Sequence, residues 1–190
     1  MIKDEIIKLL SDSKKFRTRL VENMESLDLK FINCKNCSGI CCTKAKNSMM
    51  VTPIEALNLY LYLEENIKDK KMLWEKIEES VSTYGLNREI YVKGKLLRKN
   101  YTCPLFKFES WGCPIDPYLK PLGCLGFNAT EVNVTDGKNC QSDINLLSIT
   151  EDEFSAELTV INNKLKDILK LSFDKKPIPT ALLEIRLKLK

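Results

Sequence analysis

The chain has 190 residues, of which 44% are hydrophobic and 29% charged, a composition typical of a globular protein. Its 30 basic and 26 acidic residues are spread along the sequence, so the formal net charge of +4 does not indicate a nucleic-acid-binding stripe. No histidine is present, which excludes mixed Cys–His zinc fingers and leaves a hydrolytic triad without its usual base. No segment is apolar enough to span a bilayer, and no signal-peptide core follows Met1. We therefore expect a cytoplasmic protein that binds neither membranes nor nucleic acid.

The first 30 residues predict an amphipathic helix over about 2–29, either continuous or broken near Ser11–Ser13. Four cysteines within nine residues follow it: Cys34, Cys37, Cys41 and Cys42. Four sulfurs on so short a loop can converge on one ion or cluster. Gly39 gives this loop the backbone freedom that a tight turn around a metal needs. We expect the fold to be organised around this loop.

Two helices are predicted next. Thr52-Pro53-Ile54-Glu55 indicates a helix start, because Thr52 suits the N-cap, Pro53 suits the first turn and Glu55 can complete a capping box. This helix is expected over 52–66. A second is expected over 70–84, with Gly85 as its C-terminal stop. Their Leu, Ile and aromatic stripes indicate core packing.

Short extended structure is expected between residues 90 and 97, with a turn at Gly94. Segments 101–106 and 111–115 then predict a small hairpin with one cysteine on each arm. The alternative is two irregular loops, because each of these cysteines precedes a proline that limits ladder bonding. Four single cysteines occupy this Pro- and Gly-rich part of the chain: Cys103, Cys113, Cys124 and Cys140.

Near the C-terminus, Thr150-Glu151-Asp152-Glu153 predicts a capping box that opens a helix over 150–172. Pro177 and Pro179 prevent its continuation. Residues 180–190 fit either a short helix or an edge strand. The predicted fold is a single mainly α domain, 1–190, with a small irregular or β-hairpin insert. Its cysteine-ligated metal centre, about 34–140, is expected to pack against a helical scaffold that includes helices 2–29 and 150–172.

The eight cysteines are expected to be metal ligands, because the cytosol keeps thiols reduced and argues against four structural disulfides. Eight sulfurs allow two complete four-sulfur sites. Neighbouring side chains generally diverge, so Cys41 and Cys42 can face two different sites. Sharing ligands between sites would hold loop 34–42 to segment 103–140.

The cysteine pattern resembles the YkgJ-like cysteine-cluster (CxxCxxCC) family, described as zinc- or iron-chelating domains. The quartet 34–42, Cys103-Pro104-Leu105-Phe106, Cys113-Pro114-Ile115 and the segment 121–127 carry the likeness, and Cys140 corresponds to the last cysteine. The sequence departs from the family pattern at Asp116, Lys120 and Leu125, where Tyr, Arg and Arg are usual, and has one extra residue before Pro121. The resemblance implies metal binding and extends to flagellin lysine N-methylases.

Zinc and iron–sulfur clusters both suit four-thiolate geometry. Tetrathiolate zinc sites are normally built from paired knuckles, whereas four of these cysteines are single, so we favour an iron–sulfur cluster slightly over zinc. The predicted function is metal or cluster binding with a redox or protein-modifying role and a redox partner or protein substrate. A non-catalytic zinc-stabilised interaction module is the alternative. A protein lysine N-methylase is the second alternative, although the chain has no Gly-rich nucleotide-binding fingerprint after a strand.

Overall fold

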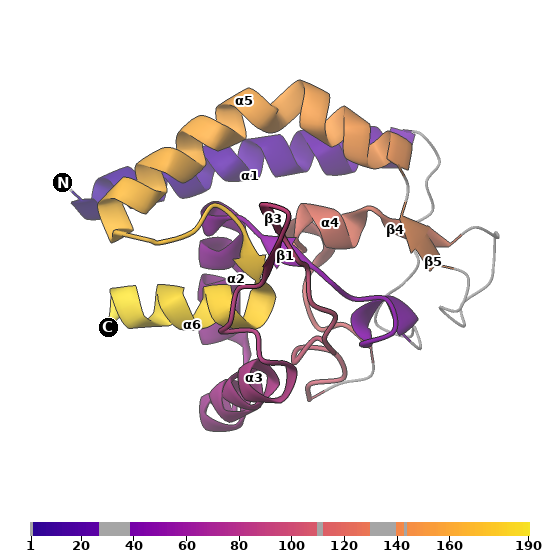
Figure 1. The fold of residues 1–190 in the computed structure, drawn as a ribbon. Coiled ribbons are helices and arrows are strands. Elements are labelled where there is room, and N and C mark those ends of the chain that lie inside the picture. Colours follow the sequence, from indigo (N-terminus) through magenta and orange to yellow (C-terminus); the bar gives the residue numbers. More distant parts are fainter. Residues whose placement is uncertain (1, 27–38, 110–111, 130–139, 143) are drawn as a thin grey trace.

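The structure is a computed structural model that describes residues 2–26, 39–109, 112–129, 140–142 and 144–190 (Figure 1). The described part of the chain is mainly helical. Its α-helices are α1 (Ile2–Ser26), α2 (Pro53–Asn66), α3 (Lys70–Tyr84), α4 (Leu122–Leu125), α5 (Ile144–Leu169) and α6 (Ile178–Leu189). Two 3₁₀ turns, η1 (Ile40–Cys42) and η2 (Pro117–Leu119), lie in the cysteine-bearing segments.

The long helices form two groups that share one core. Helices α1 and α5 lie side by side along one edge of the molecule, and α2, α3 and α6 pack together beneath them (Figure 1). Helix α2 contacts α1, α5 and α6, so it joins the two groups. Fully buried core side chains come from both groups and include Leu57, Leu59, Leu63, Ile77, Leu165 and Leu182. None of the described helices is both long and apolar enough to cross a membrane.

Within the described ranges, the strands form three short antiparallel pairs. Strand β1 (Met50–Val51) pairs with β6 (Lys176–Pro177), directly before α6. Strands β2 (Tyr91–Val92) and β3 (Lys95–Leu96) form a hairpin where extended structure with a turn at Gly94 was expected. Gly94 has a φ of 75°. Strand β4 (Phe127–Ala129) pairs with β5 (Cys140–Ser142), with Ala129 opposite Cys140.

Local sequence signals place two helices where they were expected. The backbone N–H of Thr52 donates a hydrogen bond of 2.8 Å to Glu55, which confirms the capping box at the start of α2. Helix α3 spans the predicted residues and ends at Gly85, whose φ of 58° is the left-handed conformation that favours glycine. Helix α1 runs through Ser11–Ser13 without a break, and the predicted residues 27–29 lie outside the described part of the chain.

The structure corrects the predicted start of one helix near the C-terminus and resolves the conformation of the last residues. The predicted start of the 150–172 helix is wrong, because α5 begins at Ile144 and already includes Thr150; no Gly or Pro interrupts the chain between Ile144 and Leu169. Residues 178–189 are helical rather than an edge strand, because Ala181, Leu182 and Ile185 are spaced to bury one helix face.

The predicted hairpin over 101–115 is also wrong within the described residues, where 101–109 and 112–116 contain no strand. Tight turns replace it: the N–H of Phe106 donates to the Cys103 carbonyl at 3.1 Å, and the N–H of Lys107 donates to the Gly112 carbonyl at 2.6 Å. Lys107 has a φ of 55°, which is incompatible with an extended strand. The irregular-loop alternative is therefore the one observed.

Tyr101 ties the β1–β6 pair to the cysteine-bearing segment. Its side chain is fully buried, and its hydroxyl donates to the Met49 carbonyl at 2.6 Å and accepts from the Ile178 N–H at 3.1 Å. Its own N–H donates to the Asn47 carbonyl at 3.0 Å. One phenol thus satisfies two buried backbone groups that lie 129 residues apart, one before β1 and one at the start of α6.

We predict that Tyr101→Phe lowers the free energy of unfolding by about 1–3 kcal/mol, because it leaves the Met49 carbonyl and the Ile178 N–H without their buried partner. Urea denaturation followed by circular dichroism measures the change. Tyr91→Phe is the matched control, since the Tyr91 hydroxyl bonds Glu89 on an exposed hairpin and its loss should change stability by less than about 0.5 kcal/mol. Equal effects of the two substitutions would contradict this role of Tyr101.

Candidate metal centre

Five of the predicted ligands come together in the structure. They arise from four segments: Cys41 and Cys42 from η1, Cys103 and Cys113 from the irregular loops, and Cys124 from α4. The N–H of Cys103 donates to the Cys42 carbonyl at 2.7 Å, which fixes two of these segments against each other. The thiols also act on one another. The Cys42 thiol is hydrogen-bonded to Cys41, and the pKa values of Cys103 and Cys124, raised first by burial, are raised further by neighbouring thiols. We call these five residues the cysteine cluster.

The turn that carries Cys41 and Cys42 requires glycine at position 39. Gly39 has a φ of 68°, and a Cβ placed there would lie 2.0 Å from the ring of Phe106. The following backbone folds tightly, with the Cys42 N–H donating to the Gly39 carbonyl at 2.8 Å. The expectation that Gly39 supplies the freedom for this turn is confirmed, and the close approach of Phe106 adds a reason that the sequence did not show.

The segment that carries Cys113 is anchored to the helical scaffold. The hydroxyl of Tyr62, on α2, donates to the Pro114 carbonyl at 2.8 Å. Ile115, next in the chain, is 4% exposed and belongs to the core. The irregular backbone around Cys113 is therefore held by α2 and not by strand pairing.

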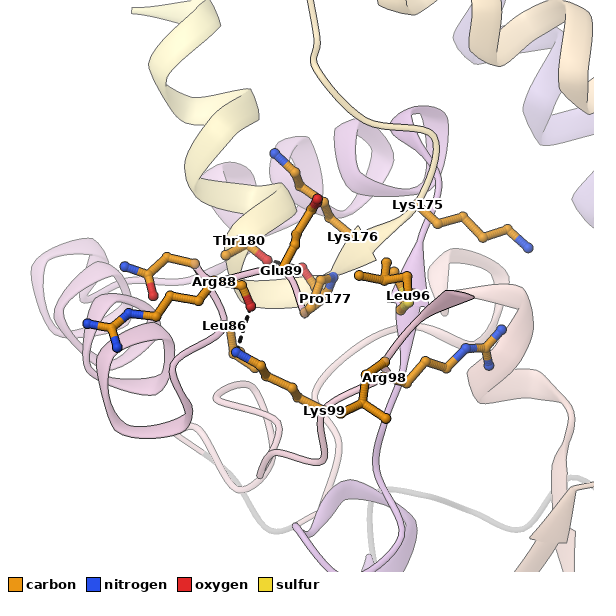
Figure 2. A pocket seen from close by; sticks show the side chains of 13 residues that line it. Leu86, Arg88, Glu89, Leu96, Arg98, Lys99, Lys175, Lys176, Pro177 and Thr180 are labelled. Atoms are coloured by element: carbon orange, nitrogen blue, oxygen red, sulfur yellow. Dashed lines mark hydrogen bonds between the residues drawn. The ribbon is translucent and has the colours of Figure 1, made fainter. Parts of the chain in front are cut away.

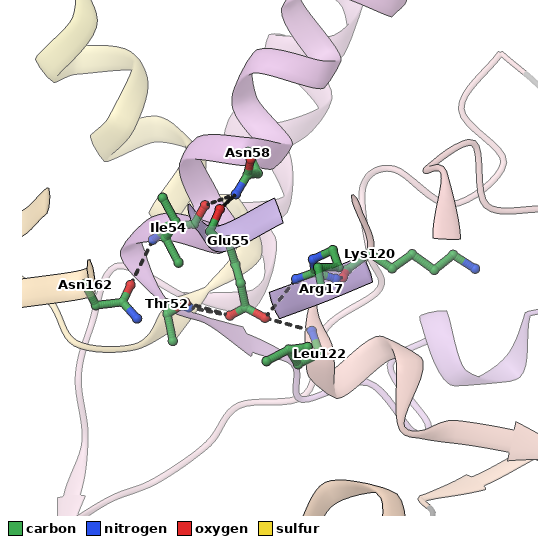
Figure 3. A network of polar contacts seen from close by, with 9 residues as sticks. Arg17, Thr52, Ile54, Glu55, Asn58, Lys120, Leu122 and Asn162 are labelled. Carbon is green, nitrogen blue, oxygen red and sulfur yellow. Dashed lines mark hydrogen bonds and ion pairs between the residues drawn. The ribbon is translucent and has the colours of Figure 1, made fainter. Parts of the chain in front are cut away.

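The start of α4, the helix that carries Cys124, is bonded to a buried carboxylate, that of Glu55 (Figure 3). One oxygen of Glu55 accepts from the N–H of Leu122, the first residue of α4, at 2.7 Å. The other accepts from the backbone and side chain of Thr52, at 2.8 and 2.9 Å. The guanidinium of Arg17, on α1, lies 3.7 Å from Glu55 and also donates to the carbonyl of Lys120. We call Arg17, Thr52, Glu55 and Leu122 the Glu55 network, which joins α1, α2 and α4.

Burial and neighbouring groups have opposite effects on the charge of Arg17. Burial lowers the pKa of Arg17, while Glu55 and Cys124 favour its charged form. The side chains of Arg17 and Glu55 are only 10% and 8% exposed, so solvent screens this pair weakly. Lys120 is 6% exposed and acts electrostatically on both Cys41 and Cys124. Two cations, Arg17 and Lys120, therefore border the cysteine cluster.

The thiols differ in acidity because their surroundings differ. Burial, followed by the nearby Cys113, raises the pKa of Cys103 to about 12. Burial also raises the pKa of Cys124 well above its usual value. Cys41 is the exception: a hydrogen bond from the Cys42 thiol, helped by Lys120, lowers its pKa to about 7 and raises that of Cys42. Of Cys41, Cys42, Cys103 and Cys124 in the absence of metal, Cys41 is the thiol that ionises most easily.

The remaining predicted ligands are only partly placed. Cys34 and Cys37 lie outside the described residues, and the side chain of Cys140 is not described. The backbone of Cys140 is described and belongs to β5. This strand contacts η1, so it lies beside the turn of Cys41 and Cys42. No disulfide joins any two members of the cysteine cluster. Among the described residues, no three Cys, Asp or Glu side chains are positioned to hold one metal ion, so the metal centre itself remains a prediction.

The sequence did not reveal the roles of Arg17 and Lys120. Arg17 lies within the predicted amphipathic helix, where a single basic residue carries no signal of burial. The sequence predicted Glu55 only as a capping residue, because a capping box involves neighbouring residues. Its hydrogen bond with Leu122 joins positions 67 residues apart and has no such local signal. In the YkgJ-like family, which the cysteine pattern resembles, Arg is usual at the position of Lys120. That correspondence was the sequence signal for a cation at this position.

No protein-family model matches the chain, and no curated protein or solved structure matches it either. The resemblance to YkgJ-like proteins therefore remains a prediction that depends on the cysteine pattern.

We predict that Glu55→Gln lowers the free energy of unfolding by about 3–5 kcal/mol, because it leaves the buried Arg17 guanidinium without its counter-charge. Urea denaturation measures the loss. Arg17→Met in the Glu55→Gln background should restore part of it, since the unpaired charge is then removed. Glu78→Gln is the control, because Glu78 is 59% exposed and its pair with Arg186 should contribute less than about 1 kcal/mol. If the double variant loses the sum of the free energies of unfolding lost by the two single variants, the coupling of Arg17 and Glu55 is contradicted.

We also predict that Cys41 reacts with iodoacetamide before Cys42, Cys103 and Cys124 in chelator-treated protein. Its low pKa gives a large thiolate fraction at neutral pH, so its rate should rise with pH and be half-maximal near pH 7. Cys103, with a pKa of about 12, should stay protonated and slow. Peptide mapping by mass spectrometry measures both rates. Cys42→Ala should move the Cys41 midpoint to higher pH because it removes the hydrogen-bond donor, and an unchanged midpoint would contradict the pairing of the two thiols.

Proposed function

We propose that this protein binds a metal centre through its cysteines, and that an iron–sulfur cluster is the preferred occupant over zinc. The observation that carries the proposal is that five cysteines from four segments between residues 41 and 124 lie near enough to act on one another electrostatically, without a disulfide between them. Hydrophobic packing does not require thiols from separate irregular segments to meet. Thiolates gathered in this way are typical of metal and cluster sites.

Electrostatics support the same proposal. The hydrogen bond to Cys41, followed by burial, raises the pKa of Cys42, and burial followed by repulsion from neighbouring thiols raises those of Cys103 and Cys124. Several thiolates together are therefore unfavourable unless positive charge is added. Arg17 and Lys120 supply part of that charge. A coordinated metal cation would supply the rest, because it deprotonates a ligating thiol outright. The donor set thus fits a soft, thiolate-preferring metal.

The number of thiols favours a cluster. A tetrahedral zinc ion needs four ligands, whereas five thiols already lie in one region and β5 brings the backbone of Cys140 beside η1. Cys34 and Cys37 remain as further candidate ligands. An iron–sulfur cluster would supply one-electron chemistry, and the cations Arg17 and Lys120 would offset the negative charge of its thiolates. The corresponding function is electron transfer with a redox partner, or a redox step on a protein substrate.

A zinc-stabilised, non-catalytic module is the second candidate. It is favoured by the way the cysteine cluster connects irregular segments to the Glu55 network and to α2. A closed zinc site in that position would act by holding these segments together. The lysine N-methylase alternative depends only on the family resemblance.

The deciding experiment is metal analysis and absorption spectroscopy on full-length protein purified without oxygen. We expect iron and acid-labile sulfide together with a broad visible absorption band that bleaches on reduction. Bound zinc with no visible absorption would support the zinc module instead. Protein without any bound metal would contradict both.

Cys103→Ser tests whether the cysteine cluster is the site. We expect it to remove most of the metal and to lower stability by several kcal/mol, because structural metal sites contribute on the order of 10 kcal/mol to folding. Ala181→Ser is the matched control: Ala181 is fully buried outside the cysteine cluster, so its substitution should lower stability while the metal content stays unchanged. Metal retention in Cys103→Ser would exclude Cys103 as a ligand.

A further inference from the structure

A second candidate site lies away from the cysteines, beside the β1–β6 pair (Figure 2). It is a pocket of about 490 Å³, within the size range of small-molecule sites. Four stretches of chain surround it: Met50 of strand β1, the loop after α3, strand β3 with the residues that follow it, and the segment of β6 that leads into α6. Neither the sequence patterns nor the proposed metal centre accounts for this pocket.

The walls of the pocket are strongly basic. Its lining includes five cationic side chains and one carboxylate, Glu89; the cations are Arg88, Arg98, Lys99, Lys175 and Lys176. Two of the cations are already engaged. Lys99 donates to the carbonyls of Gly85 and Arg88 at the end of α3, and Lys176 forms an ion pair of 2.6 Å with Glu184.

The other three cations, Arg88, Arg98 and Lys175, form no ion pair with any carboxylate in the described part of the chain. In the view of Figure 2, Arg98 and Lys175 extend toward the same side of the pocket, with Leu96 between them, whereas Arg88 extends toward the opposite side. These long side chains can approach a bound group from two directions. Only a negatively charged group between them would offset the repulsion among the three cations.

The lining also has an apolar part. Leu86 is 5% exposed, and Met50, Leu96 and Pro177 are half-buried. A ligand in this pocket therefore meets both hydrocarbon and more positive charge than the single carboxylate of the lining, Glu89, can balance. An anionic head on a partly apolar body matches that distribution.

We propose that this pocket binds a phosphate ester, with Arg98 and Lys175 holding the phosphate and Arg88 adding positive charge from the other side. Guanidinium groups bind phosphate oxygens through paired, charge-assisted hydrogen bonds. A phosphate carries close to two negative charges, which matches several unpaired cations better than a single carboxylate does. The limited volume favours a single phosphorylated group over an extended acidic peptide or a nucleic acid.

The phosphate could belong to a soluble metabolite or to a lipid headgroup, and two probes distinguish these sources. Isothermal titration calorimetry with inorganic pyrophosphate reports a soluble phosphate, and co-sedimentation with phosphatidylcholine vesicles containing phosphatidic acid reports a lipid. Both use the full-length protein as purified with its bound metal. We expect wild-type protein to bind at least one of the two probes.

The substitutions Arg98→Glu and Lys175→Glu, combined in one variant, should weaken that binding at least about tenfold, because they replace the two phosphate-holding cations by anions. The control variant combines Lys68→Glu and Lys164→Glu, two exposed lysines outside the pocket that change the net charge equally. It should weaken binding by less than about threefold. All four positions are solvent-facing, and thermal melts should verify that both variants fold. Equal weakening in the two variants, or no binding of either probe by the wild type, would overturn the proposal.

Discussion

The position of the cysteine cluster depends on one buried carboxylate. Glu55 caps α2, accepts the first N–H of α4 and faces the Arg17 guanidinium of α1, so three helices share a single negative charge. A buried carboxylate is costly unless hydrogen bonds and a counter-charge replace its water. Because each partner comes from a different part of the chain, the charge is satisfied only when α1, α2 and α4 are assembled together. Cys124 is then delivered by α4 to the other thiols.

Four members of the cysteine cluster lie on turns or irregular segments and the fifth, Cys124, lies in the four-residue helix α4, while the longer helices around them supply rigid anchor points. A helix repeats its side-chain directions every 3.6 residues, which suits a packed face but not the convergence of several sulfurs on one point. Turns with left-handed residues, such as Gly39 beside Phe106, aim side chains more freely. Tyr62 and Tyr101 hold these segments through hydrogen bonds to backbone groups. The structure thus combines conformational freedom at the thiols with stiffness directly behind them.

The cysteine cluster and the basic pocket share a structural boundary. Tyr101 precedes Cys103 by two residues, and its hydroxyl bonds the backbone at Met49 and Ile178, immediately beside the pocket-lining residues Met50 and Pro177. The β1–β6 pair therefore forms part of the pocket wall while its flanking residues are bonded to the segment that carries the thiols. Two regions with different chemistry, one of thiols and one of unpaired cations, are thus supported by the same buried phenol.

The sequence alone determined the features that depend on neighbouring residues: the capped start of α2, the glycine stop of α3, the turn at Gly94 and the identity of the candidate ligands. Only the tertiary structure decided where α5 begins, that 178–189 is a helix, and that 101–109 and 112–116 are irregular. The last two outcomes depend on partners far along the chain, such as the packing of α6 on α2 and the Tyr62–Pro114 hydrogen bond. The same holds for the site. Spacing identified eight cysteines, but five were brought together by long-range contacts, and Arg17 and Lys120 joined them through burial that no local pattern encodes.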